Sequence, residues 1–382
     1  MGNESDNTTE RTTTSKTGSS SVLTEESKDV VAAAIGNYAD RKAQEFEENS
    51  NFVQTHELRP ILRLDWQDVT IGELIGRGGY SDVHICEFQD VNKVKELDPD
   101  HSEHFVVKKL RSSSMCEKGM FIRSASDLLI ESKILSRMQH PNIIKLYATK
   151  RGSASTSFRG SINGYFLIYE MLYDLLDHRM DTWKKHQKSW LFGGLRKPSK
   201  KDMFRRLKVA FGIARAMEYL HSHRIIFRDI KPENVGFDVH DTVRLFDFGF
   251  AREMPTNDKL ANGERRKMSM VGTIRYMAPE VPTQHYGLPV DVYSFGMFLW
   301  EVTSLKPLLR QIKTEYQFME EIKEGPILPP LKQAHLSHDL NEMTKACWSA
   351  NPEDRPTFDV IAEKLRKECQ TLSAQITGGK KK

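Results

Sequence analysis

A glycine-rich segment at residues 75–83 contains residue types that can contact phosphate. Glycines let a backbone approach a phosphate closely and point its N–H groups at it. After the glycines the chain alternates with a period of two, with Val83 and Ile85 on one face and Asp82 and His84 on the other. This predicts a β-hairpin, not the strand-to-helix turn of a dinucleotide fold, and no GxxxxGK[ST] motif occurs. An ordinary hairpin turn is the alternative.

A lysine and a glutamate farther along the chain are the next candidates. Lys108 ends the apolar run Phe105–Lys108, and Glu131 lies in Asp127–Met138, which has a helical pattern. A lysine at the end of a buried strand needs an anionic partner, because an unpaired buried charge is costly. Taken singly, either residue could equally be a surface charge.

Several further motifs follow in a fixed order, and the series ends with Arg355 in Asp-Arg-Pro-Thr-Phe. Together with the glycine loop, Lys108 and Glu131, these motifs resemble those of a eukaryotic protein kinase domain. The resemblance extends from about Trp66 to Leu372. It implies an α+β bilobal fold, with a small β-rich N-lobe that contains one main helix and a large helical C-lobe. The motifs are Phe227-Arg-Asp-Ile-Lys-Pro-Glu-Asn234, Asp247-Phe-Gly249, Ala278-Pro-Glu280 and the Asp-Val-Tyr-Ser-Phe-Gly stretch that starts at Asp291.

The resemblance implies ATP and Mg²⁺ as cofactors, because such domains transfer the γ-phosphoryl group of ATP by positioning and charge neutralisation. Lys108 is expected to hold the α- and β-phosphates, and Glu131 is expected to orient Lys108. Asp247 and Asn234 are the expected metal ligands, since carboxylate and amide oxygens suit a hard cation.

The catalytic loop indicates the type of substrate. By resemblance, Asp229 orients or accepts the proton of the attacking hydroxyl, and Lys231 faces the transferring phosphate, as in serine/threonine kinases. The stretch Cys347-Trp-x3-Pro-x2-Arg355 resembles the C-lobe of tyrosine kinases and tyrosine-kinase-like enzymes. The combination predicts a serine/threonine kinase of the tyrosine-kinase-like group acting on protein substrates. The alternatives are a tyrosine or dual-specificity kinase and a pseudokinase scaffold, and the complete catalytic set argues against the scaffold.

The predicted ATP site departs from the family pattern at several positions. Ser81 replaces the third glycine of the loop, and Phe227, expected to pack against Phe248, replaces the usual histidine. In the predicted adenine pocket, Val106 adds volume to the roof and Gly236 removes volume from the floor. We expect these two changes to compensate each other, with adenine bound closer to the floor. The predicted ATP-binding residues are Gly76, Gly78, Gly79, Ser81, Val83, Val106, Lys108, the gatekeeper Tyr169, the hinge residues Glu170, Met171 and Leu172, and Gly236.

The resemblance also implies structural pairs and a regulatory site. Glu280 is expected to pair with Arg355, and Asp291 to hydrogen-bond the catalytic-loop backbone. Ser269 lies 11 residues before Glu280, where the family carries its main activation phosphosite. The regulatory set is therefore Ser269, Arg228, which grips an activation-loop phosphate in such enzymes, and Thr273, expected near Asp229 in the substrate groove. An upstream activating kinase is the partner that this implies.

The remaining chain divides into segments around the domain. Residues 1–21 are predicted to be a disordered tail, and 22–65 an extension of helix-forming composition that is either loosely packed or an inhibitory or docking helix. The kinase domain is expected at 66–372, with the N-lobe at 66–169 and the C-lobe at 174–372, followed by a basic tail at 373–382. Polar stretches at 89–103, 151–164 and 184–202 are expected to be surface insertions.

Composition excludes several classes of protein. Of the 382 residues, 38% are hydrophobic, which is enough for a folded core, and the net charge of +4 is too mild to predict nucleic-acid binding. The apolar runs are too short for a membrane span, and residues 1–21 contain no apolar signal-peptide core. Four separated cysteines without a CxxC motif argue against a zinc site and disulfides. We therefore expect a cytoplasmic protein, with nuclear entry left open by the basic run 196–201.

Overall fold

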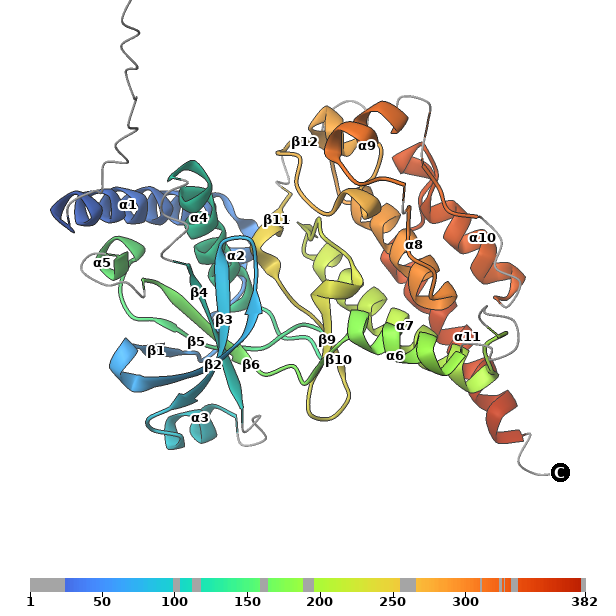
Figure 1. Cartoon of the computed structure of the whole chain (residues 1–382), viewed down its shortest axis with the longest axis horizontal. Coiled ribbons are helices and arrows are strands. Elements are labelled where there is room, and N and C mark those ends of the chain that lie inside the picture. Colours follow the sequence, from blue (N-terminus) through green and yellow to red (C-terminus); the bar gives the residue numbers. More distant parts are fainter. Residues whose placement is uncertain are drawn as a thin grey trace, which may run out of the picture.

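The computed structural model has two lobes, and Figure 1 shows a small lobe built on a β-sheet beside a larger helical lobe. The structure describes residues 25–98, 104–111, 118–158, 164–187, 196–254, 266–309, 311–322, 325, 327–330 and 336–378. The predicted disordered tail at 1–21 and residues 379–382 of the predicted basic tail lie outside these ranges. Within the described ranges, no helix combines the length and the apolar character needed to cross a bilayer.

Among the described residues, the sheet of the N-lobe has six strands in the order β1-β5-β6-β4-β3-β2, and of their pairs only β1–β5 is parallel. Side chains that alternate along β4 separate its two faces, so Val106 joins the core shared with the C-lobe and Val107 joins a smaller core beside α3. The glycine loop joins the antiparallel strands β2 and β3, which confirms the predicted hairpin. The strands are β1 (Leu62–Leu64), β2 (Val69–Arg77), β3 (Ser81–Phe88), β4 (Phe105–Leu110), β5 (Leu146–Lys150) and β6 (Phe166–Glu170).

Two long helices lie side by side on the N-lobe (Figure 1): α4 carries Glu131, and α1 comes from the N-terminal extension. Ala32, Ile35, Ala39 and Ala43 of α1 are buried at helical spacing, so the extension belongs to the core and the loosely packed alternative is wrong. The N-lobe helices are α1 (Glu25–Asn49), α2 (Asn51–Thr55), α3 (Asn92–Leu97), α4 (Lys118–Leu135) and α5 (Ala154–Phe158).

Helix α5 corrects the expectation that residues 151–164 form only a surface insertion. It packs against α1 so closely that a Cβ added at Gly36 would lie 2.4 Å from the Cα of Ser155. Both carboxylate oxygens of Asp40 accept backbone N–H groups at the start of α5, from Ala154 and Ser155, at 2.8 Å each. The first N–H groups of a helix have no partner within it, so Asp40 caps α5 from another helix.

The C-lobe is organised around α7 and the almost completely buried α8, with α11 packed along α7. Helix α7 begins with a capping box in which Ser199 and Asp202 bond each other's backbone N–H groups. Helix α11 continues through Leu372, the predicted end of the domain. The helices are α6 (Leu176–Gln187), α7 (Lys200–Ser222), α8 (Pro289–Ser304), α9 (Glu315–Glu321), α10 (His338–Cys347) and α11 (Phe358–Gly378).

Short sheets in the C-lobe hold the loops that carry the motifs. Strands β8 and β11 pair the segment before the Arg-Asp motif with the segment after Asp-Phe-Gly, and β12 and β13 pair two parts of the segment before α8. The third sheet has the order β10-β9-β7. These strands are β7 (Asp174–Leu175), β8 (Ile225–Ile226), β9 (Val235–Phe237), β10 (Val243–Leu245), β11 (Arg252–Glu253), β12 (Arg266–Lys267) and β13 (His285–Tyr286).

Candidate active site

Lys108 lies between two carboxylates that come from different lobes. Its Nζ is 2.8 Å from Oε2 of Glu131 on α4 and 2.8 Å from Oδ1 of Asp247, which precedes the 3-10 turn Phe248–Phe250. The Glu131 side chain is only 2% exposed, whereas that of Asp247 is 49% exposed and open to a ligand. The predicted trio is therefore assembled, with its anionic and cationic groups already in contact.

The charges in this trio shift one another's pKa values. Burial would lower the pKa of Lys108, but Asp247 and Glu131 outweigh it and raise that pKa. Lys108 in turn holds the pKa of Asp247 below its usual value. For Glu131, burial outweighs Lys108 and raises the pKa. Lys108 and Asp247 are thus charged at neutral pH, while Glu131 is the member closest to protonation.

The gatekeeper Tyr169 is a further partner of this trio. Its hydroxyl donates to Oε1 of Glu131 at 2.8 Å, so each oxygen of this buried carboxylate has a partner. Burial and Glu131 raise the pKa of Tyr169 well above its usual value, so the hydroxyl remains a donor. The sequence did not predict the bond from Tyr169 to Glu131, because no local sequence pattern pairs positions 38 residues apart.

Asp229 lies at the centre of a second cluster. Its Oδ1 accepts the backbone N–H and the hydroxyl of Thr273 at 2.9 and 2.8 Å. Its Oδ2 lies 2.7 Å from Lys231 Nζ and accepts Asn234 Nδ2 at 2.8 Å. Lys231 also donates to Thr273 Oγ1 at 2.9 Å, which places Thr273 beside Asp229 as expected.

The catalytic loop is supported from below by Asp291 on α8. This carboxylate is completely buried and accepts the backbone N–H groups of Phe227 and Arg228 at 2.8 Å each, which confirms the expected contact. His221 Nε2 lies 3.0 Å from the same carboxylate. The ring of Phe227 packs edge-on against Phe248 with centroids 5.1 Å apart, so an aromatic side chain does fill the usual histidine position.

Two residues beside the site have left-handed backbone, Arg228 with φ 73° and Asp247 with φ 64°. This conformation costs roughly 1–2 kcal/mol for a residue with a Cβ. The hydrogen bonds that Asp291 accepts from the Arg228 N–H and that Asp247 accepts from Lys108 offset that cost. Strained backbone supported in this way is typical of functional sites.

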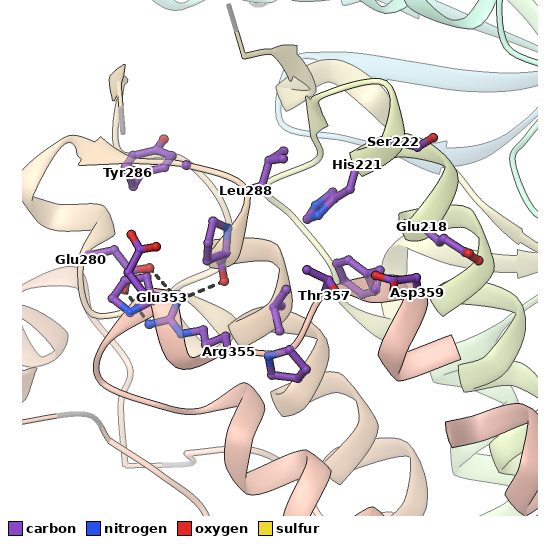
Figure 2. A pocket seen from close by; sticks show the side chains of 16 residues that line it. Glu218, His221, Ser222, Glu280, Tyr286, Leu288, Glu353, Arg355, Thr357 and Asp359 are labelled. Carbon is purple, nitrogen blue, oxygen red and sulfur yellow. Dashed lines mark hydrogen bonds and ion pairs between the residues drawn. The ribbon is translucent and has the colours of Figure 1, made fainter. Parts of the chain in front are cut away.

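Glu280 and Arg355 form the predicted ion pair in two-point geometry, with N–O distances of 2.6 and 3.0 Å. Figure 2 shows the two side chains facing each other at one wall of a cavity of about 660 Å³. None of the predicted ATP-site residues lines this cavity. The pair therefore ties the end of residues 247–280, here called the activation segment, to the C-lobe, away from the predicted ATP-site residues.

Comparison with known proteins decides the family, because a family model described as Protein kinase domain matches residues 69–366. This chain belongs to the protein kinase family. The kinase is 31% identical over 283 residues to "Probable serine/threonine-protein kinase gdt4" of Dictyostelium discoideum, a match that covers 71% of this chain and 15% of that protein. It is 33% identical over 252 residues to "Serine/threonine/tyrosine-protein kinase HT1" of Arabidopsis thaliana, covering 65% and 56%.

A third relative is a receptor of the tyrosine type. "Tyrosine-protein kinase receptor svh-2" of Caenorhabditis elegans is 26% identical over 336 residues, 85% of this chain and 27% of that protein. The mixture of serine/threonine and tyrosine names fits the predicted tyrosine-kinase-like group. The chain spans only about one sixth of the first two relatives that it matches.

The kinase family uses ATP and a divalent metal ion, and the donor set here fits both. Asp247 presents a half-exposed carboxylate. Asn234 uses its Nδ2 on Asp229, which leaves its carbonyl oxygen as the group available to a cation. Gly78 donates its N–H to Ser81 O at 2.8 Å, so the hairpin that would cover the phosphates is closed.

The adenine side of the site corrects one expectation. Gly236 does not leave the floor empty, because a Cβ there would lie 2.7 Å from Leu172 Cδ1 and 3.2 Å from Asp174 O. The hinge leucine occupies the space that the glycine vacates. Val106 lies in β4 opposite Tyr169 of β6, and its place on the roof over adenine stays a prediction. Glu170 faces away from this region, since its Oε1 accepts the N–H of Lys145 at 2.8 Å.

The regulatory residues occupy one neighbourhood without direct contact between side chains. Arg228 Nη1 donates to the Tyr286 hydroxyl at 3.3 Å, and that hydroxyl donates to the backbone oxygen of Ser269 at 2.6 Å. Arg228 Nε also donates to Phe250 O at 2.6 Å. Ser269 is exposed. Tyr286 therefore links Arg228 with Ser269.

Tyr169→Phe tests the hydrogen bond to Glu131. That bond lowers the pKa of Glu131, so its loss raises the pKa further and moves the acid limb of kcat/KM for ATP to higher pH. At neutral pH we expect kcat/KM to fall about tenfold, from the loss of a hydrogen bond to a charged group worth about 1.5 kcal/mol. Tyr147→Phe is the control, because the Tyr147 hydroxyl bonds Asp98 on the other face of the sheet. An acid limb of kcat/KM at the same pH in the wild type, Tyr169→Phe and Tyr147→Phe would contradict a role of the Tyr169–Glu131 bond.

Gly236→Ala tests the corrected floor. The new Cβ must displace Leu172, and overpacking of this kind costs roughly 1–3 kcal/mol, so we expect KM for ATP to rise severalfold. Adding Leu172→Ala removes the obstructing methyl groups and should return KM toward the wild-type value. Adding Val106→Ala to Gly236→Ala should leave KM for ATP raised. Rescue by Val106→Ala alone would show that the roof and the floor compensate each other.

Proposed function

We propose that this kinase transfers the γ-phosphoryl group of ATP to serine and threonine hydroxyls of protein substrates. The arrangement of Asp229, Lys231 and Thr273 carries the proposal. A lysine 2.7 Å from the carboxylate that would orient the attacking hydroxyl is placed to neutralise charge on the transferring phosphate. The relative from Dictyostelium discoideum that is named a serine/threonine kinase supports the same assignment.

Each residue has a defined part in the proposed reaction. A substrate hydroxyl would replace Thr273 Oγ1 as the donor to Asp229 Oδ1, and Asp229 would then orient it and receive its proton. Lys108 would exchange part of its contact with Asp247 for the ATP phosphates, while Glu131 keeps it in place. We propose Mg²⁺ as the metal ion, held by Asp247 and Asn234, which would neutralise the phosphate charge.

Regulation by phosphorylation forms a second part of the proposal. We propose that an upstream kinase modifies Ser269 and that the phosphate binds Arg228, which lies one side chain away across Tyr286. Ser269 is exposed and thus accessible to another enzyme. The cytoplasmic location and the lack of a nucleic-acid partner remain predictions from the sequence.

Asp229→Asn is the decisive test of the activity. Loss of the group that orients the hydroxyl should reduce kcat by about 10²–10⁴-fold. The assay uses Mg-ATP with degenerate peptides whose only acceptor is serine, threonine or tyrosine. Asp241→Asn is the matched control, since Asp241 pairs with Arg179 on the surface. Equal incorporation in both variants would contradict the enzyme assignment, and products on tyrosine alone would identify a tyrosine kinase.

Ser269→Ala tests the regulatory site. We expect phosphorylated wild-type protein to exceed Ser269→Ala in kcat/KM by about tenfold, within the usual range for coupling between two sites. Ser222→Ala, which alters an exposed serine at the end of α7, should behave as the wild type. The number of phosphates bound per protein molecule is followed by mass spectrometry. A phosphate-free wild type that is as active as the phosphorylated one would contradict regulation at Ser269.

A further inference from the structure

Residues 25–59, here called the N-terminal brace, contact the two elements that hold Lys108. These elements are α4, which carries Glu131, and the segment 247–254 that begins with Asp247. The brace consists of α1, α2 and the residues that follow them. Its contacts to these two elements lie behind α4 and at β11, on groups that the proposed reaction does not use, and α1 packs on α5 as well.

The first contact fixes α4 through charge as well as packing. Glu47 of the brace lies 2.6 Å from Lys133 Nζ and 3.4 Å from Arg137 Nη2. Arg137 also donates from Nε to the backbone oxygens of Val53 and His56, at 2.9 and 3.2 Å. The C-terminal end of α4 and the residues after it are therefore bonded to both α1 and α2. Since Glu131 is two residues before Lys133, movement of this end of α4 also moves Glu131.

The second contact fixes the start of the activation segment. Glu253 of β11 accepts the Ser50 hydroxyl and, at 3.0 Å, the backbone N–H of Phe52. Ser50, Phe52 and Glu253 are 2%, 2% and 9% exposed, so this carboxylate is held away from water by the brace. A buried carboxylate that lost both donors would be unstable, so detachment of the brace must also move β11.

Strand β11 links these contacts to the site. Neighbouring side chains of a strand point to opposite sides, so Glu253 faces the brace while Arg252 bonds Asp127 of α4. Arg252 also donates to Gly249 O at 3.0 Å, next to Asp247. The brace, α4 and β11 thus each contact the other two, and they surround the Glu131 and Asp247 carboxylates that bond Lys108. Backbone and side chains in such a set adopt few arrangements.

We propose that the N-terminal brace is a positioning element that holds Glu131 and Asp247 against Lys108, with Glu47 and Ser50 as its positioning residues. An inhibitory extension would have to compete with a substrate or move Glu131 away. The brace instead bonds α4 and β11 while the pairs of Lys108 with Glu131 and Asp247 are both formed. The kinetic part of this inference rests on the proposed function, whereas the structural part does not.

The test uses full-length protein with single changes. Glu47→Ala removes the contact to Lys133, and Ser50→Ala removes one donor to Glu253. Glu48→Ala is the matched control, because the neighbouring Glu48 is exposed and bonds only Gln44 of its own helix among its described side-chain contacts. Glu47→Gln serves as a milder variant should the alanine protein not fold. Hydrogen exchange at 118–135 and 247–254 is measured together with kcat and KM for ATP.

We expect faster exchange in both segments and a rise of about tenfold in KM for ATP for Glu47→Ala and Ser50→Ala, relative to Glu48→Ala. A lower melting temperature with unchanged exchange and KM would overturn the proposal, because it would leave only a packing role. Increased activity would overturn it in favour of an inhibitory helix. If the variants exchange faster but the wild-type protein phosphorylates no peptide, the structural role of the brace holds and the proposed function is rejected.

Discussion

The structure depends on one ammonium group held between two carboxylates. Lys108 lies on a strand of the N-lobe, Glu131 on a helix of that lobe, and Asp247 on a loop of the C-lobe. Because a buried charge is stable only beside its partners, the three elements must meet at this point when the chain folds. The contact thereby ties the two lobes together at this point.

The supports differ in kind. Tyr169 satisfies the remaining oxygen of Glu131, and Asp291 holds the backbone on which Asp229 is mounted. The Glu280–Arg355 pair anchors the far end of the activation segment, where Arg355 has a fully buried side chain. Removing one partner of such a buried pair leaves an uncompensated charge, so these supports have little tolerance for substitution.

The fold and the residues that meet at the site were predictable because ordered motifs mark them directly. Lys108, Asp229 and Asp247 each lie in a short local pattern, and the hairpin follows from alternation around Val83. The expected floor of the ATP site was wrong because Gly236 receives Leu172 from a separate segment, and packing between segments leaves no local signature. The same holds for Ser50 and Glu253, 203 positions apart. A single polar stretch likewise does not reveal that Ala154 and Phe158 are buried.

The close packing of α1 on α5 limits how the sequence of this protein can change in evolution. Gly36 admits the backbone of Ser155 at a distance that no side chain would allow, and Asp40 supplies both of its oxygens to the first turn of α5. Each segment is therefore shaped for the other, although more than a hundred residues separate them in the chain. A kinase that acquired the helix without the 151–158 segment would expose the face of α1 that packs on α5, and one with only the segment would leave the first N–H groups of α5 without their cap. The extension and the insertion can thus be gained, lost or transplanted only as a matched pair.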